Sequence, residues 1–206
     1  MLTEKQIELF TVFVKYPFKK QTRQEIKNIA SEKSNNALSL AFSQFKEENL
    51  LIEKKVGKSS LYSLNFENNL VYHYIALSNE KRLKKIVTNS INYIEKEVKK
   101  ITPFFSIAIF GSYAIQEEKK KSDLDIAIFI EDKKKIKEIE LNLRNAELYS
   151  IIKLDLHVIT REDMVEMLSN YEENQGKQIA RKHMAIYNHR LFYDLLNEGM
   201  KNGFKL

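Results

Sequence analysis

The sequence predicts an α+β protein, and three features along the chain carry this prediction. Three short blocks of apolar residues at helical spacing occupy the first 49 residues. Two short alternating runs joined by a glycine turn follow them and are typical of a β-hairpin. After Pro103, short apolar runs alternate with charged segments of helical length, a pattern of α/β or α+β folds. We therefore expect a small mixed sheet flanked by helices in the second half of the chain.

The start of the chain predicts three short helices and a hairpin in a fixed order. The first helix ends at Pro17, Thr22 caps the second, and Ser34 begins the third. Residues 51–64 form the hairpin, with Lys58 at its tip.

This order of elements resembles the winged helix-turn-helix over roughly residues 1–66. The resemblance implies a DNA-binding domain whose third helix enters the major groove of duplex DNA. It assigns the DNA contacts to side chains outside the helical core and to the hairpin tip, where a lysine meets phosphate: Asn35, Asn36, Ser39, Ser43 and Lys58. A winged helix that mediates only protein contacts is the alternative.

The net charge of +6 is concentrated in the first half of the chain. Residues 1–69 carry +3, residues 70–100 carry +4 and residues 101–206 carry −1. A basic half joined to a near-neutral half suggests a nucleic-acid-facing module attached to a second module, although a solvated lysine-rich surface explains the charge equally well.

We expect the two modules to be joined by a helical connector. Residues 67–100 read as this connector, with a break near Ser78 and Asn79, and residues 101–206 form the second domain. Lysine and arginine residues along the connector either extend a nucleic-acid surface or are simply solvated.

Composition excludes several classes of function. The chain has no cysteine, which rules out disulfides, thiolate zinc sites and cysteine nucleophiles and favours a reducing, cytoplasmic location. The longest uncharged stretch, residues 101–116, is shorter than the roughly 20 apolar residues of a membrane span. We therefore expect no membrane association.

Residues 110–130, FGSYAIQEEKKKSDLDIAIFI, hold most of the chemical information. Gly111 lets the backbone approach a ligand closely, and the Ser112 hydroxyl adds a hydrogen-bond donor beside the amides of a helix start. Asp123 and Asp125 are two residues apart in an alternating strand, so both carboxylates point to one face. Each aspartate by itself also fits an ion pair with a lysine.

A third carboxylate lies on a later strand, residues 151–159. Its apolar residues alternate with Asp155 and His157, which therefore share the opposite face. If this strand neighbours the first, three carboxylates come together and provide the oxygen ligands that a hard divalent cation prefers. We interpret His157 as a packed or hydrogen-bonded residue and expect His183 at the surface.

The Gly-Ser turn, a ten-residue spacer, Asp-Leu-Asp and a later single aspartate resemble the polymerase-β nucleotidyltransferase superfamily over residues 104–160. The spacing resembles the minimal nucleotidyltransferase branch in particular. The resemblance implies that Gly111 and Ser112 bind the triphosphate of a nucleoside triphosphate. It also implies that Asp123 and Asp125 chelate two Mg²⁺ ions and that Asp155 completes the catalytic metal site.

Two functional hypotheses follow. The first is a Mg²⁺-dependent nucleotidyltransferase that moves a nucleoside monophosphate, with AMP from ATP favoured, to a hydroxyl of a protein or nucleic acid. Minimal members of the family often act as antitoxins that adenylylate a HEPN toxin, so such a toxin is a candidate partner. A second copy of the chain, in a homodimer, is another candidate partner. The second hypothesis is a DNA-binding transcriptional regulator whose nucleotidyltransferase-like domain only senses nucleotide or binds a partner.

Overall fold

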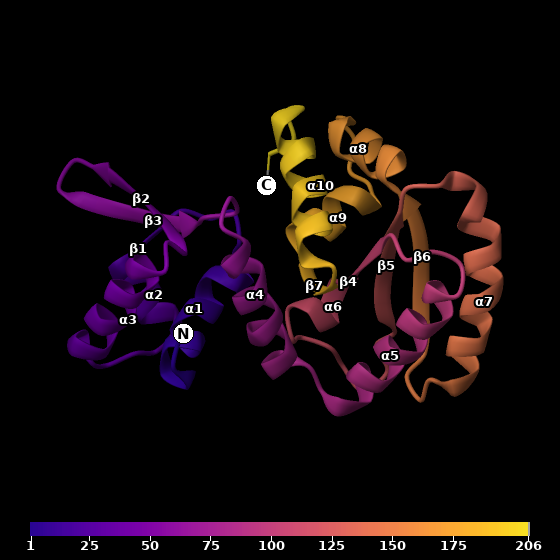
Figure 1. Cartoon of the computed structure of the whole chain (residues 1–206), viewed down its shortest axis with the longest axis horizontal. Helices are drawn as coiled ribbons and strands as arrows, with labels where there is room; N and C mark the ends of the chain where they lie inside the picture. Colours follow the sequence, from indigo (N-terminus) through magenta and orange to yellow (C-terminus); the bar gives the residue numbers. More distant parts are fainter. Residues whose placement is uncertain (206) are drawn as a thin grey trace. The chain divides into compact units, whose positions relative to one another are not determined.

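The computed structural model describes residues 1–205 and divides the chain into two compact units (Figure 1). The first unit comprises residues 1–81 and the second begins at Arg82. The mixture of helices with small sheets confirms the predicted α+β class.

The first unit contains four helices and a three-stranded antiparallel sheet of order β1-β3-β2. The helices are α1 (Glu4–Lys15), α2 (Arg23–Ile29), α3 (Asn35–Glu47) and α4 (Asn69–Arg82), the last residue of which belongs to the second unit. The strands are β1 (Gln21–Thr22), β2 (Leu51–Val56) and β3 (Ser59–Leu64). The hairpin of β2 and β3 extends away from the helices of this unit (Figure 1).

Local capping explains the boundaries of the short helices. Thr22 forms a capping box with Glu25 at the start of α2, and the Ser34 side chain accepts a hydrogen bond from the Ala37 amide at the start of α3. Beyond the end of α3, Asn49 adopts the left-handed conformation, with φ of 51°. These caps confirm the helix boundaries predicted around Thr22 and Ser34.

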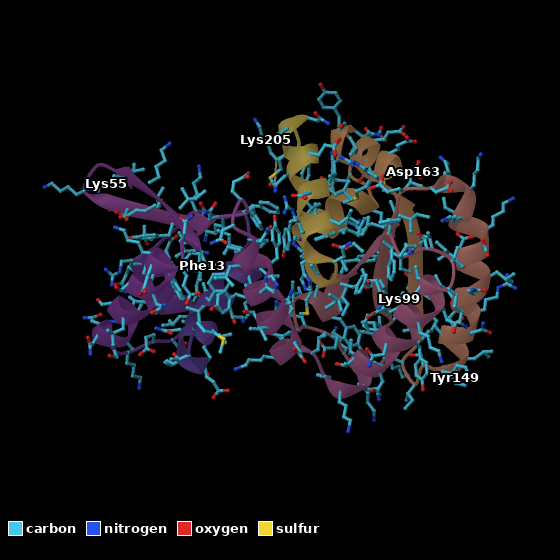
Figure 2. The ribbon with its side chains drawn as sticks, viewed as in Figure 1. Phe13, Lys55, Lys99, Tyr149, Asp163 and Lys205 are labelled. Carbon is cyan, nitrogen blue, oxygen red and sulfur yellow. The ribbon has the colours of Figure 1, made fainter. Side chains whose placement is uncertain are left out.

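An aromatic cluster forms the core of the first unit. Phe10 packs against Phe45 and Tyr74 with ring centroids 5.6 and 5.7 Å apart, and Phe13 packs against Phe42 at 6.3 Å. Figure 2 shows Phe13 among the helices of this unit, whereas Lys55 extends from the hairpin. The cluster fixes which face of α3 is buried, so the opposite face is exposed.

Residues 67–100 form two helices as predicted, but the break between them lies at residues 83–84 and not near Ser78 and Asn79. Helix α4 continues to Arg82, and α5 (Lys85–Lys99) begins after an extended residue at Lys84, with φ of −77° and ψ of 142°. Serine and asparagine lower helix propensity by only about 0.5 kcal/mol each, which is too little to end a helix.

The second unit is built on a four-stranded mixed sheet of order β6-β5-β4-β7. Its strands are β4 (Phe105–Phe110), β5 (Leu124–Ile130), β6 (Leu154–Thr160) and β7 (His183–Tyr187). Only the β5–β6 pair is parallel, with α7 (Ile136–Tyr149) in the connection between them. Strand β6 starts three residues later than predicted, because the Ser150 hydroxyl donates to the Ile152 carbonyl and holds a turn there.

Helices cover both faces of this sheet (Figure 1). Apolar residues of α5 and α7 pack on one face, against isoleucines such as Ile107 and Ile126. On the other face Phe129 packs against Phe192 of α10 (His189–Lys201) at 5.3 Å. The remaining elements are α6 (Gly111–Ala114), a 3-10 turn η1 (Lys133–Lys135), α8 (Arg161–Ser169) and α9 (Gln175–Arg181). No helix among residues 1–205 is long and apolar enough to cross a membrane.

Candidate functional site

Two of the predicted aspartates lie side by side on neighbouring strands. Asp125 of β5 and Asp155 of β6 are direct partners in the parallel register. Neighbouring strands lie about 4.8 Å apart, and paired residues in this register point to the same face. Asp125 is half-buried and Asp155 is exposed, so the pair lies where the sheet opens to solvent.

Gly111 lies directly against the Asp125 carboxylate. It follows the last residue of β4 and has a left-handed backbone, with φ of 67°. A Cβ at this position would lie 2.2 Å from Asp125 Oδ2, far closer than van der Waals contact. Only glycine therefore fits here without moving the carboxylate, since it accepts the backbone conformation and leaves the space open.

Ser112 occupies the second position of α6, next to this contact. Helix α6 is a single turn of four residues, and the Glu117 amide donates to the Ser112 carbonyl at 2.9 Å. Ser112 is partly exposed. Its position beside Gly111 brings a hydroxyl group and backbone amides to the neighbourhood of Asp125.

The electrostatics of the site centre on Asp125. Burial raises the pKa of its carboxyl above the usual range, and the nearby Asp155 and Asp123 carboxylates raise this pKa further, whereas His157 lowers it. The negative charges of Asp123 and Asp155 therefore repel that of Asp125 across a region that is partly shielded from water. A bound cation would relieve this repulsion and stabilise the ionised form of Asp125.

The other two carboxylates have cationic or ionisable partners. Lys153 Nζ contacts Asp123 Oδ2 at 2.5 Å, and His157 Nε2 lies 3.2 Å from Asp155 Oδ2. Among residues 1–205, no three acidic or histidine side chains are gathered closely enough to form a metal site. The three aspartates therefore supply suitable oxygen donors but do not converge in this conformation.

The donor chemistry nevertheless fits a hard divalent cation. The Lys153 side chain is 79% exposed and that of Asp123 is 36% exposed, and ion pairs this open to water are weak. The Asp123 carboxylate can therefore turn toward a cation at small cost, and the oxygen atoms of all three aspartates are of the kind that Mg²⁺ prefers.

Lys153 is a site residue that motif reasoning missed. It lies two residues before Asp155, just ahead of β6, and so belongs to the same alternating set as Asp155 and His157. That spacing was the available signal. His157 itself packs against Phe110, with ring centroids 5.6 Å apart, in agreement with its interpretation as a packed residue.

His183 is only partly exposed and packs against α10, whereas a surface position was predicted. Its Nδ1 lies 2.9 Å from the Ala180 carbonyl oxygen, and its Nε2 is buried with no hydrogen-bond partner among the described residues. Burial lowers the pKa of His183 to about 4. The flanking charges in the sequence suggested exposure, but the ring packs against Phe192 and Tyr193 of α10.

The residues predicted to contact DNA are all exposed in the first unit. Asn35, Asn36, Ser39 and Ser43 lie on the exposed face of α3, and Lys58 lies in the turn between β2 and β3.

Two basic side chains are fixed to this face of α3. Lys27 Nζ donates to Asn35 Oδ1 at 2.5 Å, and Arg23 Nη2 donates to Ser39 Oγ at 2.9 Å. A groove of about 530 Å³ runs between α3 and the hairpin, and Arg23 and Lys46 help to line it. Positive charge therefore accompanies the polar residues of α3.

Residues 91–184 match the family model described as the nucleotidyltransferase domain. The matched range contains Gly111, Ser112 and the three aspartates, together with β4, β5 and β6. The match supports a polymerase-β-type nucleotidyltransferase and nucleoside monophosphate transfer in general. Neither a curated protein nor a solved structure matches the chain.

Proposed function

We propose that the second unit catalyses Mg²⁺-dependent transfer of a nucleoside monophosphate, with AMP from ATP favoured, to a hydroxyl of a protein or nucleic acid. The observation that carries this proposal is the register pairing of Asp125 with Asp155 directly beside Gly111. Both features lie within the range matched by the nucleotidyltransferase family.

Each residue has a defined role in this proposal. Gly111 and Ser112 bind the triphosphate, because the backbone amides at the start of α6 and the Ser112 hydroxyl can donate hydrogen bonds to phosphate oxygens. Asp123, Asp125 and Asp155 hold the metal. When bound, Mg²⁺ would neutralise the triphosphate and stabilise the pyrophosphate that leaves. The acceptor oxygen bonds to the α-phosphorus as the bond to pyrophosphate breaks, and the Asp155 carboxylate takes up the proton of the acceptor hydroxyl.

A labelling experiment tests the transfer. Wild-type protein and the Asp123→Ala plus Asp125→Ala variant are incubated with ATP labelled at the α-phosphate, Mg²⁺ and candidate acceptors, including a HEPN-type toxin and RNA. We expect label on an acceptor only with the wild type. The matched control replaces Asp132 and Asp194 by alanine, since both lie near the opposite end of β5.

Label that appears equally with the wild type and with the Asp123→Ala plus Asp125→Ala variant would contradict the proposed site. A HEPN-type toxin is the acceptor suggested by the resemblance to antitoxin nucleotidyltransferases, in which the toxin is adenylylated. Label on the toxin and none on RNA would identify this chain as the enzyme of such a pair.

We further propose that residues 1–66 form a winged helix that binds duplex DNA. Support comes from the exposed polar residues of α3 and the exposed Lys58 in the hairpin turn. We expect salt-sensitive binding that weakens in the Asn36→Ala plus Lys58→Ala variant but not in Lys15→Ala, which removes an exposed charge from α1. Equal DNA affinity in all three proteins would reject this surface.

The second candidate function is a DNA-binding regulator that binds nucleotide without turnover. The separation of the three aspartates favours it, because among residues 1–205 they do not converge to form the metal site that catalysis would require. This alternative predicts nucleotide binding in calorimetry together with no transfer of label to any acceptor.

A further inference from the structure

Two segments that are distant in the sequence meet beside the Gly111–Ser112 turn. Arg82 Nη2 donates to the Ala114 carbonyl at 2.8 Å. Gln116 Nε2 donates back to the Arg82 carbonyl at 3.4 Å, and Arg82 Nε lies 3.5 Å from Gln116 Oε1. These contacts, called the Arg82 clasp below, join the start of the second unit to the segment that follows α6.

The Arg82 clasp provides a hydrogen-bond donor to the Ala114 carbonyl, which has no partner within the short helix α6. Ala114 is the last residue of α6, which has four residues and no side-chain cap at its N-terminus. A single helical turn is unstable on its own, because too few backbone hydrogen bonds offset the loss of chain entropy. The guanidinium of Arg82 supplies a charged donor to this turn from outside it.

The segment after α6 is further constrained. Gln116 has a left-handed backbone, with φ of 61°, which is unfavourable for a residue with a side chain. The Glu117 amide bonds to the Ser112 carbonyl, and Glu118 forms an ion pair with Lys84. Both ends of the segment are therefore held, one to Ser112 and the other to the residues around Arg82.

Arg82 is buried more than a solvated arginine would be. It is partly buried, and dehydration lowers the pKa of its guanidinium. Withdrawing this group from water is unfavourable unless hydrogen bonds replace the lost hydration. Its bond to the Ala114 carbonyl is such a replacement, which makes Arg82 a fixed anchor for the turn.

We infer that Arg82 is a positioning residue that holds Gly111 and Ser112 in the geometry required to bind the nucleotide triphosphate. This inference rests on the proposed function of the second unit. Gly111 lies so close to Asp125 that a shift of α6 changes the space between the turn and the carboxylate. Arg82 acts through the backbone of α6 and has no contact with substrate in this role.

The test compares Arg82→Met, Arg82→Lys and Gln116→Leu with the wild type. We expect Arg82→Met to raise the Kd and the KM for MgATP about tenfold, as loss of a hydrogen bond from a charged group does, with kcat changed much less. Gln116→Leu should shift both constants in the same direction, and Arg82→Lys should restore part of the affinity. Arg144→Met, at an exposed arginine of α7, is the matched control and should stay within twofold of the wild type.

Hydrogen exchange supplies a readout that does not depend on nucleotide. Amides of residues 111–117 should exchange faster in Arg82→Met and Gln116→Leu, whereas amides of β5 should keep their protection. If the wild type binds no nucleotide, the proposed function fails, and this measurement still tests the clasp. Unchanged exchange at residues 111–117, or faster exchange with unchanged MgATP affinity, would overturn the positioning role. Gln116→Leu keeps the test valid if Arg82→Met fails to fold.

Discussion

Replacement of Gly111 by alanine probes the contact between the turn and the Asp125 carboxylate. The new Cβ would lie 2.2 Å from Asp125 Oδ2 and 3.2 Å from Cγ, so the carboxylate must move by about 1 Å to reach ordinary contact. A displacement of this size in a catalytic group costs about 100-fold in rate. We therefore expect Gly111→Ala to lower nucleotidyl transfer about 100-fold.

The free energy of unfolding of Gly111→Ala measures the same clash independently of enzyme activity. The left-handed backbone at Gly111 costs alanine about 1 kcal/mol, and overpacking adds about 1–3 kcal/mol. Gly57→Ala is the matched control, because Gly57 has φ of 59° and no atom within 4 Å of a Cβ placed there. We expect Gly57→Ala to show only the backbone cost, whereas Gly111→Ala shows both.

A double-mutant cycle isolates the clash. In Asp125→Ala the carboxylate is absent, and the remaining Cβ at position 125 is 3.7 Å from a Cβ at position 111, an ordinary contact. The overpacking part of the Gly111→Ala cost should therefore disappear in the Asp125→Ala background. Urea unfolding followed by circular dichroism measures the four free energies. An equal cost of Gly111→Ala in both backgrounds, or a cost equal to that of Gly57→Ala, would refute the reasoning.

Three further predictions concern separate groups. In the folded state the His183 ring stays neutral down to pH about 4, whereas in the unfolded chain it takes up a proton near pH 6.5. The unfolding free energy should therefore decrease by about 3 kcal/mol as the pH is lowered from 6.5 to 4. Urea unfolding at several pH values should show this decrease in the wild type and not in His183→Gln. An equal dependence of unfolding free energy on pH in both proteins would count against a buried neutral imidazole. Lys153→Met removes the cation beside Asp123 and should tighten Mn²⁺ binding up to about fivefold, as measured by electron paramagnetic resonance titration. Lys137→Met is the control. Weaker Mn²⁺ binding in Lys153→Met would show that Lys153 does not compete with the metal. Ser112→Ala should weaken MgATP binding about tenfold by calorimetry with little change in Tm, and an unchanged Kd would exclude the hydroxyl as a phosphate ligand.

Local patterns in the sequence were sufficient for most element types and several of their ends, but not for the two-residue strand β1, which forms only by pairing with β3. Thr22 and Ser34 cap helices as predicted, because a cap depends on residues within one turn of the chain. The strand that begins at Leu124 and the short strand ending at Tyr187 also followed from apolar runs of strand length. The motif with Gly111 and Asp125 was visible for a similar reason, since both residues lie in the single short stretch of residues 110–130.

Tertiary structure decided how these local pieces act on each other. Alternation places a carboxylate on one face of a strand, but the register that sets Asp125 beside Asp155 depends on packing between distant segments. The same holds for the contact of Gly111 with Asp125. The burial of His183 against α10 is a third case, because no local pattern counts the neighbours that enclose a ring. The chemical groups of the site follow from local sequence patterns, whereas long-range packing sets the distances between these groups and the pKa values that depend on those distances.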